Sequence, residues 1–312
     1  MPFPFRTPIE GVGFVEISVA GITTNVYVAG APGEAILIDC GAASDAPGVI
    51  ESLKANGVAP DSIRAIVLTH GHCDHYGGAA RLAAWSGAPV WAHVAAAVNL
   101  EDPRGDFLSR MSWVENTGSG AWERFCEVAG AGWPVARCLR EGDVLEVGPL
   151  RLEVFHAPGH ERGAVTLFER ARRLAWVGDL VQGGMDASAN WLGLYTDVAG
   201  QRRSLARVRE LDPAWLFKGH REPRTGRDVA MDLASATARV EKVEKAIRRA
   251  LEAWETLTLA DAARAAARDV LGRDESAPGR YMLVTARAVL TELALRGLAR
   301  QTPDLTWERV GV

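Results

Sequence analysis

The sequence predicts an α/β protein, a layered sheet followed by a small helical domain, on the basis of three observations. Short apolar segments alternate with helical ones over the first two thirds of the chain. His and Asp residues recur directly after several of those apolar segments. Beyond about residue 228 the chain becomes rich in Ala, Arg and Glu with helical periodicity. Strands that alternate with helices favour a layered sheet over a helix bundle.

The composition is that of an ordinary globular protein. The chain has 312 residues, of which 48% are apolar and 24% charged. This length allows one large domain and a small one. A net charge of −4 argues against a protein built to coat nucleic acid or an acidic membrane. Nucleic acid and membrane are therefore not the partners we expect.

The N-terminus and the cysteines predict a cytoplasmic protein. The first ten residues, MPFPFRTPIE, lack the basic and apolar regions of a signal peptide. No apolar run approaches the roughly 18–20 residues that span a bilayer. The four cysteines show no CxxC pairing, so we expect reduced thiols.

Alternating apolar and helical segments fill the first part of the chain. Val, Ile and aromatic residues predict strands, whereas a terminal Gly or amphipathic spacing predicts helices. We expect strands at 13–28, 34–39, 63–69 and 89–93, and helices at 46–56 and 79–86.

Residues 95–140 interrupt this rhythm and form a long insertion that we expect to be irregular to helical. Insertions of this length are more often functional than idle. The insertion contains the large apolar residues Phe107, Met111, Trp113, Trp122, Phe125 and Trp133. Strands are expected again at 143–147, 151–156, 164–169, 173–177 and 215–218, with an aromatic loop at 183–195 and a helix at 201–210.

The last part of the chain predicts a separate helical domain. We place the catalytic domain at 1–228 and the C-terminal domain at 229–312. Helical periodicity and the break at Pro278-Gly279 predict helices at 229–253, 258–271 and 281–298, followed by a hairpin within 301–312. Three helices and a hairpin would suit a winged helix.

The cluster HGHCDH carries the chemistry. It places His70, His72, Asp74 and His75 directly after the strand at 63–69. Imidazole nitrogen and carboxylate oxygen are the donors that a borderline divalent metal prefers. One such cluster cannot complete two metal sites, so further ligands must come from other strand ends.

Three further candidates occur in the expected form. His160, Asp179 and His220 each follow a glycine just after an apolar strand. The alternative is that HGHCDH is a polar loop and the other histidines are scattered. Five histidines and two aspartates at four strand ends make that alternative improbable. His93 and His156 remain, and we interpret both as ordinary buried or half-buried histidines.

These segments resemble the metallo-β-lactamase superfamily. The similarity covers about residues 10–222 through NVYV (25–28), LIDCG (37–41), LTHGHCDHYGG (68–78), APGH (157–160), VGDL (177–180) and KGH (218–220). It implies a four-layer αβ/βα sandwich with metals at one edge. It also implies one ion held by His70, His72 and His160 and a second by Asp74, His75 and His220, with Asp179 bridging them.

The C-terminal helices resemble the winged-helix-like domain of one branch, which includes endoribonucleases. Two departures from the superfamily pattern are Glu161-Arg162, where relatives often have Thr-Pro, and Arg221-Glu222 after the last histidine. Both pairs are either substrate contacts or solvated loops.

The ligand set predicts a hydrolase with two Zn²⁺ ions per chain, Fe or Mn being the alternatives. Two ions lower the pKa of a bridging water from about 15.7 toward about 7, which provides a hydroxide nucleophile. Asp74 is the expected proton shuttle. Asp39 and Thr69 are expected to orient the imidazoles.

Three functions remain open. The first is hydrolysis of a small acyl compound (a thioester, ester or lactone), with Trp113, Arg162 and Trp191 as candidate pocket residues. The second is cleavage of single-stranded RNA, and the third is a catalytically silent binding or regulatory role. From Arg239 onward the chain contains thirteen Arg and Lys and eleven Asp and Glu. This small excess of positive charge is weak evidence for RNA binding. The C-terminal domain could also shape a homodimer.

Overall fold

The computed structural model describes residues 1–19, 22–111, 120–182 and 192–310. The chain forms two compact units. The first comprises 1–156, 163–179 and 212–225. The second comprises 157–162, 180–211 and 226–312. Its last segment begins at residue 226, and it includes the segments 157–162 and 180–211. The domain boundary expected at 228 stays a prediction.

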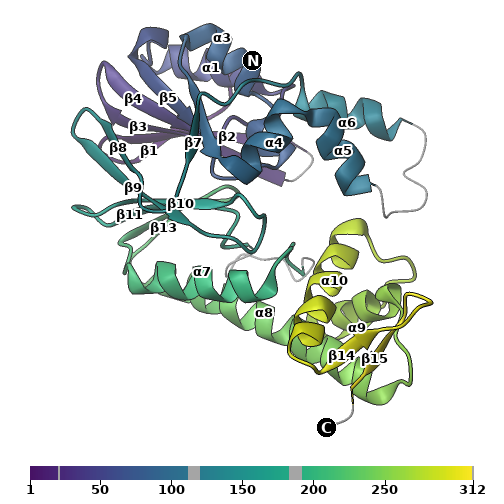
Figure 1. The fold of residues 1–312 in the computed structure, drawn as a ribbon. Helices are drawn as coiled ribbons and strands as arrows, with labels where there is room; N and C mark the ends of the chain where they lie inside the picture. Colours follow the sequence, from purple (N-terminus) through teal and green to yellow (C-terminus); the bar gives the residue numbers. More distant parts are fainter. Residues whose placement is uncertain (20–21, 112–119, 183–191, 311–312) are drawn as a thin grey trace. The chain divides into compact units, whose positions relative to one another are not determined.

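A seven-stranded sheet forms one layer of the first unit (Figure 1). Its strands lie side by side in chain order, antiparallel from β1 to β4 and parallel from β4 to β7. They are β1 (Phe5–Ile9), β2 (Val12–Val19), β3 (Ile22–Ala31), β4 (Glu34–Ile38), β5 (Ile63–Val67), β6 (Val90–His93) and β7 (Arg137–Leu139).

A six-stranded mixed sheet forms a second layer of the same unit, in the order β13-β12-β11-β10-β9-β8. Among its described strands, only β11 and β12 run parallel. The strands are β8 (Val144–Val147), β9 (Leu150–His156), β10 (Val165–Glu169), β11 (Leu174–Gly178), β12 (Trp215–Lys218) and β13 (Arg224–Thr225). Every residue of β10 and β11 is buried, as expected of interior strands.

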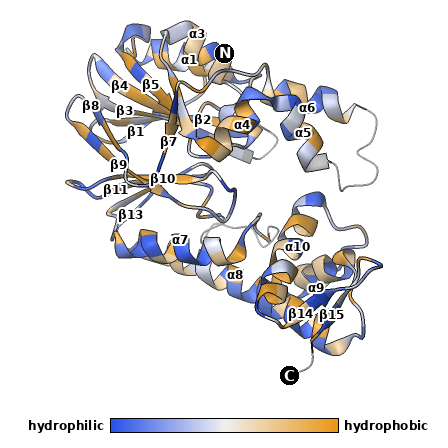
Figure 2. Ribbon diagram, viewed as in Figure 1, coloured by the Kyte–Doolittle hydropathy of each residue, from blue (hydrophilic) through white to orange (hydrophobic). Residues whose placement is uncertain are grey.

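Two hydrophobic cores hold the layers together, and β4 contributes to both. Ile36 and Ile38 belong to the core that joins the two sheets, together with Trp176 and Phe217. The alternate residue Leu37 belongs to the core on the other face. Side chains of a strand point alternately to its two faces, so this strand is apolar on both. Figure 2 shows the hydrophobic colour along β2 and β10.

Helices cover the outer face of the seven-stranded sheet. They are α1 (Ala46–Ala55), η1 (Pro60–Ser62), α2 (Cys73–Tyr76) and α3 (Ala79–Ser86). Leu53 of α1 and Leu82 of α3 are fully buried in the core on this face. Mixed sheets with covering helices make an α/β sandwich, as the sequence predicts.

The described part of the insertion at 95–140 is mainly helical, which agrees with the irregular to helical structure expected there. It contains α4 (Val94–Glu101), α5 (Pro103–Met111) and α6 (Ala121–Ala129), and it ends in β7, a strand that the sequence did not predict. This edge strand has only three residues, RCL, and pairs with β6. So short a segment carries no usable alternation of polar and apolar side chains.

The second unit is mainly helical. It contains α7 (Val198–Glu210), α8 (Arg227–Ala253), α9 (Leu259–Leu271) and α10 (Arg280–Leu295), and a hairpin of β14 (Ala299–Gln301) and β15 (Trp307–Arg309). Three helices and a hairpin follow residue 226, as predicted, whereas the likeness to a winged helix stays a prediction. Among the described residues, no helix combines the length and apolar character needed to cross a membrane.

Candidate metal centre

Strand ends position most of the candidate ligands. β5 leads into Thr69 and His70, β11 into Asp179, and β12 into His220. The short helix α2 begins after His72 and includes Asp74 and His75. This helix is held next to the end of β4, because the backbone N–H of Cys40, two residues after that strand, donates to the carbonyl of His75 at 2.7 Å.

One group of candidate ligands converges within the first unit. Asp74, His75 and His220 each offer an atom, and these atoms all lie within 4.8 Å of one another. The Nε2 atoms of His75 and His220 are 3.3 Å apart. Asp74 Oδ2 lies 3.5 Å from Nε2 of His220 and 3.7 Å from Nε2 of His75.

Asp179 joins this group. Its Oδ2 lies 3.1 Å from Nε2 of His220, and its Oδ1 lies 3.6 Å from Nε2 of His75. The Asp179 side chain is 8% exposed. Both oxygens of this buried carboxylate therefore face the imidazoles.

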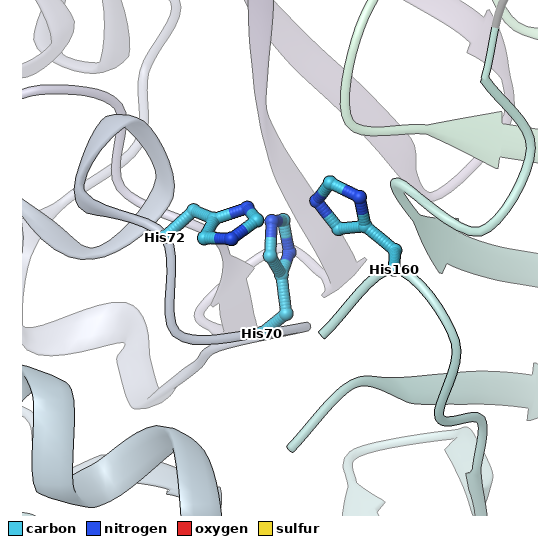
Figure 3. Close-up of side chains that lie close together, drawn as sticks. All are labelled: His70, His72 and His160. Carbon is cyan, nitrogen blue, oxygen red and sulfur yellow. The ribbon is translucent and has the colours of Figure 1, made fainter. Parts of the chain in front are cut away.

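Three imidazoles form the other group. His70, His72 and His160 offer nitrogen atoms that also lie within 4.8 Å of one another, and Figure 3 shows the three side chains. All three residues are buried. His160 lies in the segment that joins β9 to β10.

Asp39 and Thr69 lie within hydrogen-bond distance of two of the imidazoles. Thr69 donates its backbone N–H and its hydroxyl to Asp39, at 2.8 Å each. Asp39 Oδ2 is 3.0 Å from His75 Nδ1, and Thr69 Oγ1 is 3.0 Å from His70 Nδ1. With the proton held on Nδ1, the lone pair of Nε2 is available to a metal.

Asp39 also lies near His70 and His75 as a third group of candidate ligands. Its carboxylate already accepts hydrogen bonds from Thr69 and faces Nδ1 of His75. Asp39 is 1% exposed. These bonds favour the orienting role that the sequence analysis gave it over a role as ligand.

Backbone carbonyls orient two further histidines. His220 Nδ1 is 2.6 Å from the carbonyl oxygen of Thr23, and His160 Nδ1 is 2.9 Å from that of Leu194. Asn25 donates to the carbonyls of Lys218 and Arg221, on either side of His220, at 3.0 and 2.6 Å. In both histidines, Nε2 is again the nitrogen that could bind a metal.

Four residues contribute to this site without having been predicted from the sequence, namely Thr23, Leu194, Asn25 and Gln182. Gln182 contacts His160 Nδ1, and its Oε1 accepts the Leu194 N–H at 2.8 Å. Asn25 was visible only as the first residue of the NVYV motif. A main-chain carbonyl has no signature in the sequence.

Two glycines keep the strand ends close together. A Cβ on Gly178, whose φ is +49°, would lie 2.5 Å from the Thr69 hydroxyl oxygen. A Cβ on Gly219 would lie 2.3 Å from Asp179 Oδ1 and 2.6 Å from His75 Cε1. The absence of a side chain at these positions is therefore required by the arrangement of the candidate ligands.

The carboxylates make this region a receptor for positive charge. Burial by itself lowers the pKa of the His75 imidazole. The charges of Asp74, Asp179 and Asp39 outweigh burial and raise it to about 10. For His220, burial also lowers the pKa, but Asp179 leads the charges that raise it overall.

The remaining candidates fall in different places. Arg162, proposed for the pocket, is exposed. Trp113 and Trp191, proposed with it, lie outside the described residues. His93 and His156 stack on each other with ring centroids 4.4 Å apart, in neither ligand group.

The aromatic residues of the insertion divide between packing and exposure. Phe107 lies 5.1 Å from Trp122 and 5.3 Å from Phe125, measured between ring centroids. Phe125 and Trp133 pack against the core on the helix-covered face of the sheet. Trp122 is 38% exposed. Some aromatic residues of the insertion therefore belong to the hydrophobic core and do not line a substrate pocket.

The family follows from the sequence profile. Residues 20–220 match the metallo-β-lactamase superfamily, which is more than half of the chain. The chain belongs to this superfamily. Its α/β sandwich and its His and Asp clusters, which could hold metal, agree with that membership.

Curated relatives are similar over part of their length. An acyl-coenzyme A thioesterase MBLAC2 from Gallus gallus is 33% identical over 165 residues, 50% of this chain and 54% of that protein. A hydroxyacylglutathione hydrolase GloC from Haemophilus influenzae is 28% identical over 137 residues, 44% and 56% of the two chains. The chain therefore spans about half the length of the curated relatives it matches.

Solved structures share the fold over nearly the whole chain. A metallo-β-lactamase family protein from Thermus thermophilus superposes with a TM-score of 0.75 and 20% identity, covering 97% of this chain and all of that one. A β-lactamase domain protein from Burkholderia ambifaria gives 0.73 and 18%, covering 99% and 96%. These similarities establish the fold alone.

Proposed function

We propose that this protein is a hydrolase with two metal ions that cleaves a small acyl substrate, in the first place a thioester. The observation that carries the proposal is the spacing of ligand atoms. Two atoms bound at about 2.0–2.1 Å to one tetrahedral ion lie about 3.3 Å apart. The Nε2 atoms of His75 and His220 are 3.3 Å apart, and Asp179 Oδ2 is 3.1 Å from the latter.

The donor set suits zinc. Imidazole nitrogen and carboxylate oxygen without any thiolate are typical of hydrolytic zinc sites, and Fe or Mn are the alternatives. His70, His72 and His160 would hold one ion. Asp74, His75 and His220 would hold the other, and Asp179 would lie between the two.

Bound metal ions would supply a hydroxide nucleophile near neutral pH and a Lewis acid for the acyl carbonyl. The protein's own residues provide the rest. Asp74 is 40% exposed, so its carboxylate can accept a proton at the site and return it to solvent or to the leaving group. Asp39 and Thr69 keep two imidazoles from rotating.

A thioester is the acyl compound that the comparisons favour. One relative is named for acyl-coenzyme A and another for hydroxyacylglutathione, and coenzyme A and glutathione are both thiols. Arg162 is exposed two residues after the candidate ligand His160. A guanidinium there could bind the phosphate or carboxylate groups that such carriers contain.

The test combines metal analysis with a substrate panel. We expect close to two metals per chain and faster hydrolysis of acyl thioesters than of lactones, β-lactams or single-stranded RNA. His75→Ala should lose about one metal. Its kcat/KM should fall at least about 100-fold, because even groups that only orient ligands contribute about 10–100-fold.

His156→Gln is the matched control, because His156 is a half-buried imidazole outside both ligand groups. This variant should keep both metals and most of the activity. A folded wild-type protein without metal, or with RNA as the preferred substrate, would contradict the proposal.

A further inference from the structure

The segment from Gly193 to Asp197 connects helix α10 with the loop that carries His160. The carbonyl oxygen of Gly159 accepts the backbone N–H of Thr196 at 2.7 Å and that of Asp197 at 3.0 Å. The same segment is bonded to α10 at its other side. All of these residues belong to the second unit.

Thr285 makes the bonds on the α10 side. Its hydroxyl donates to the carbonyl of Gly193 at 2.8 Å and accepts the N–H of Tyr195 at 3.1 Å. Thr285 is fully buried, and so is Tyr195, at 1% exposed. A buried hydroxyl that both donates and accepts is fixed in orientation, and its loss leaves two backbone groups without that partner.

Leu194 stands between the two bonded residues and faces His160. Its carbonyl oxygen is 2.9 Å from His160 Nδ1, and its N–H donates to Gln182 Oε1 at 2.8 Å. The backbone on either side of the carbonyl that orients the imidazole is therefore fixed by Thr285.

We infer that Thr285 is a positioning residue for the candidate ligand His160. The inference rests on the proposed role of His160 in holding a metal. Through Gly193 and Tyr195, the α10 hydroxyl fixes the Leu194 carbonyl, which fixes the plane of the imidazole. The C-terminal helical region thereby contributes to metal affinity without providing a ligand.

The expected effect is moderate and specific. Removing a group bonded directly to a ligand costs about 10–100-fold in metal affinity, and Thr285 lies one step further away. Thr285→Val keeps the shape and removes the hydroxyl. It should weaken binding of one of the two ions about 3–10-fold, and the visible spectrum of the cobalt-substituted protein should change.

Two variants serve as controls. Thr285→Ser retains the hydroxyl and should restore wild-type affinity and spectrum. Thr237→Val removes a hydroxyl that donates only to the Leu233 carbonyl within helix α8, at 2.9 Å, so it should change neither. If Thr285→Val does not fold, Thr285→Ala, which relieves any crowding by the second methyl, provides the same test.

The measurement is a titration of the full-length protein with Zn²⁺ and with Co²⁺, and His160→Ala is included to identify the affected ion. Loss of one ion in His160→Ala together with weaker binding in Thr285→Val supports the inference. Loss in His160→Ala with unchanged affinity and spectrum in Thr285→Val overturns it and leaves the proposed function intact. Full retention of both ions in His160→Ala overturns both.

Discussion

At the scale of single residues, the site is a cation receptor that holds protons in the absence of metal. Three carboxylates surround His75 closely enough to raise its pKa to about 10 despite complete burial. Asp179 faces both His75 and His220. Protonated imidazoles therefore neutralise these carboxylates, and a metal ion that binds there would have to displace the protons.

This electrostatic balance predicts that metal binding releases protons and strengthens with pH. A metal takes the neutral imidazole, so a histidine whose pKa is about 10 must lose its proton at pH 7. We expect at least one proton released per chain, and affinity that rises from pH 6.5 to pH 9. Calorimetric titration in buffers of different ionisation enthalpy measures both. Binding without proton release, independent of pH over this range, would contradict the prediction.

The stability of the metal-free protein provides a second readout of the same charges. The pKa of His75 is raised from 6.5 in the unfolded chain to about 10 in the folded one. Its stabilising contribution is fully present below about pH 6.5 and is lost as pH rises through about 10. The unfolding temperature of the chelated protein should therefore fall over this window, and that of His156→Gln should fall equally.

The candidate ligands could be named from the sequence, but the orientation of their imidazoles could not. His and Asp side chains after apolar strands are visible as a pattern, and so is Asp39 at the end of β4. The acceptors at Thr23 and Leu194 are backbone carbonyls, which every residue has. Which carbonyl faces an imidazole depends on contacts between residues far apart in the chain.

At the scale of elements, the site is made where strand ends of both sheets meet. β5, β11 and β12 end at His70, Asp179 and His220, each within a few residues. A glycine precedes two of these ligands, and at each glycine a Cβ would overlap a neighbouring strand end. These positions are glycine mainly because the backbone lies so close to its neighbours, and less because a turn requires glycine.

Gly219→Ala is predicted to prevent normal metal binding while leaving the sheets intact. The new methyl would lie 2.3 Å from Asp179 Oδ1 and 2.6 Å from His75 Cε1, so both side chains must move. We expect a loss of about tenfold or more in affinity for at least one ion, as found when ligand orientation is disturbed. The measurement is metal content after dialysis together with far-ultraviolet circular dichroism.

Gly279→Ala is the matched control for this substitution. Gly279 precedes α10 with a φ of −63°, and a Cβ there would meet only the Tyr281 ring, at 3.5 Å. The Gly279→Ala variant should bind metal normally. Full metal content in Gly219→Ala would show that the strand ends have more room than these distances allow.

Interior strands were easier to predict than edge strands. β4, β5, β10 and β11 are apolar runs bounded by turns, and the sequence prediction is confirmed for them. β1, which reads FRTPI, was missed, because an edge strand can contain Pro and charged residues that a central strand cannot. An apolar run in the sequence predicts a strand that is buried on both faces. An edge strand such as β1 is not buried in this way, so its composition gives no such signal.

At the scale of the whole molecule, the two units are not consecutive in sequence. Ser204 of α7 donates to the Pro158 carbonyl at 2.8 Å, and Thr285 bonds to residues about ninety positions earlier. A boundary placed where composition changes identifies the start of the last helices. It cannot identify short segments such as 157–162, which hydrogen bonds connect with α7 and with residues 196 and 197.

The charges of the C-terminal region are largely paired within it. Among the thirteen Arg and Lys after residue 238, at least seven arginines of the described residues lie within 4.0 Å of a carboxylate. The pairs are Arg248–Glu252, Arg249–Asp269, Arg264–Asp261, Arg268–Asp274, Arg273–Glu275, Arg296–Glu244 and Arg300–Glu308. Phosphates of RNA would have to compete with these carboxylates, which opposes a nucleic-acid function.

The protein is therefore predicted to bind single-stranded RNA weakly, with a Kd above about 10⁻⁴ M at physiological salt. Fluorescence anisotropy with a labelled single-stranded RNA measures this between about 50 and 200 mM salt. Glu244→Gln is the informative variant, because Glu244 pairs with Arg202 as well as Arg296. Removing that charge releases two guanidinium groups, so binding should strengthen and its salt dependence should steepen by about 0.7 for each further phosphate that the protein neutralises. Tight, salt-sensitive binding by the wild type would instead mean that these ion pairs open readily for RNA.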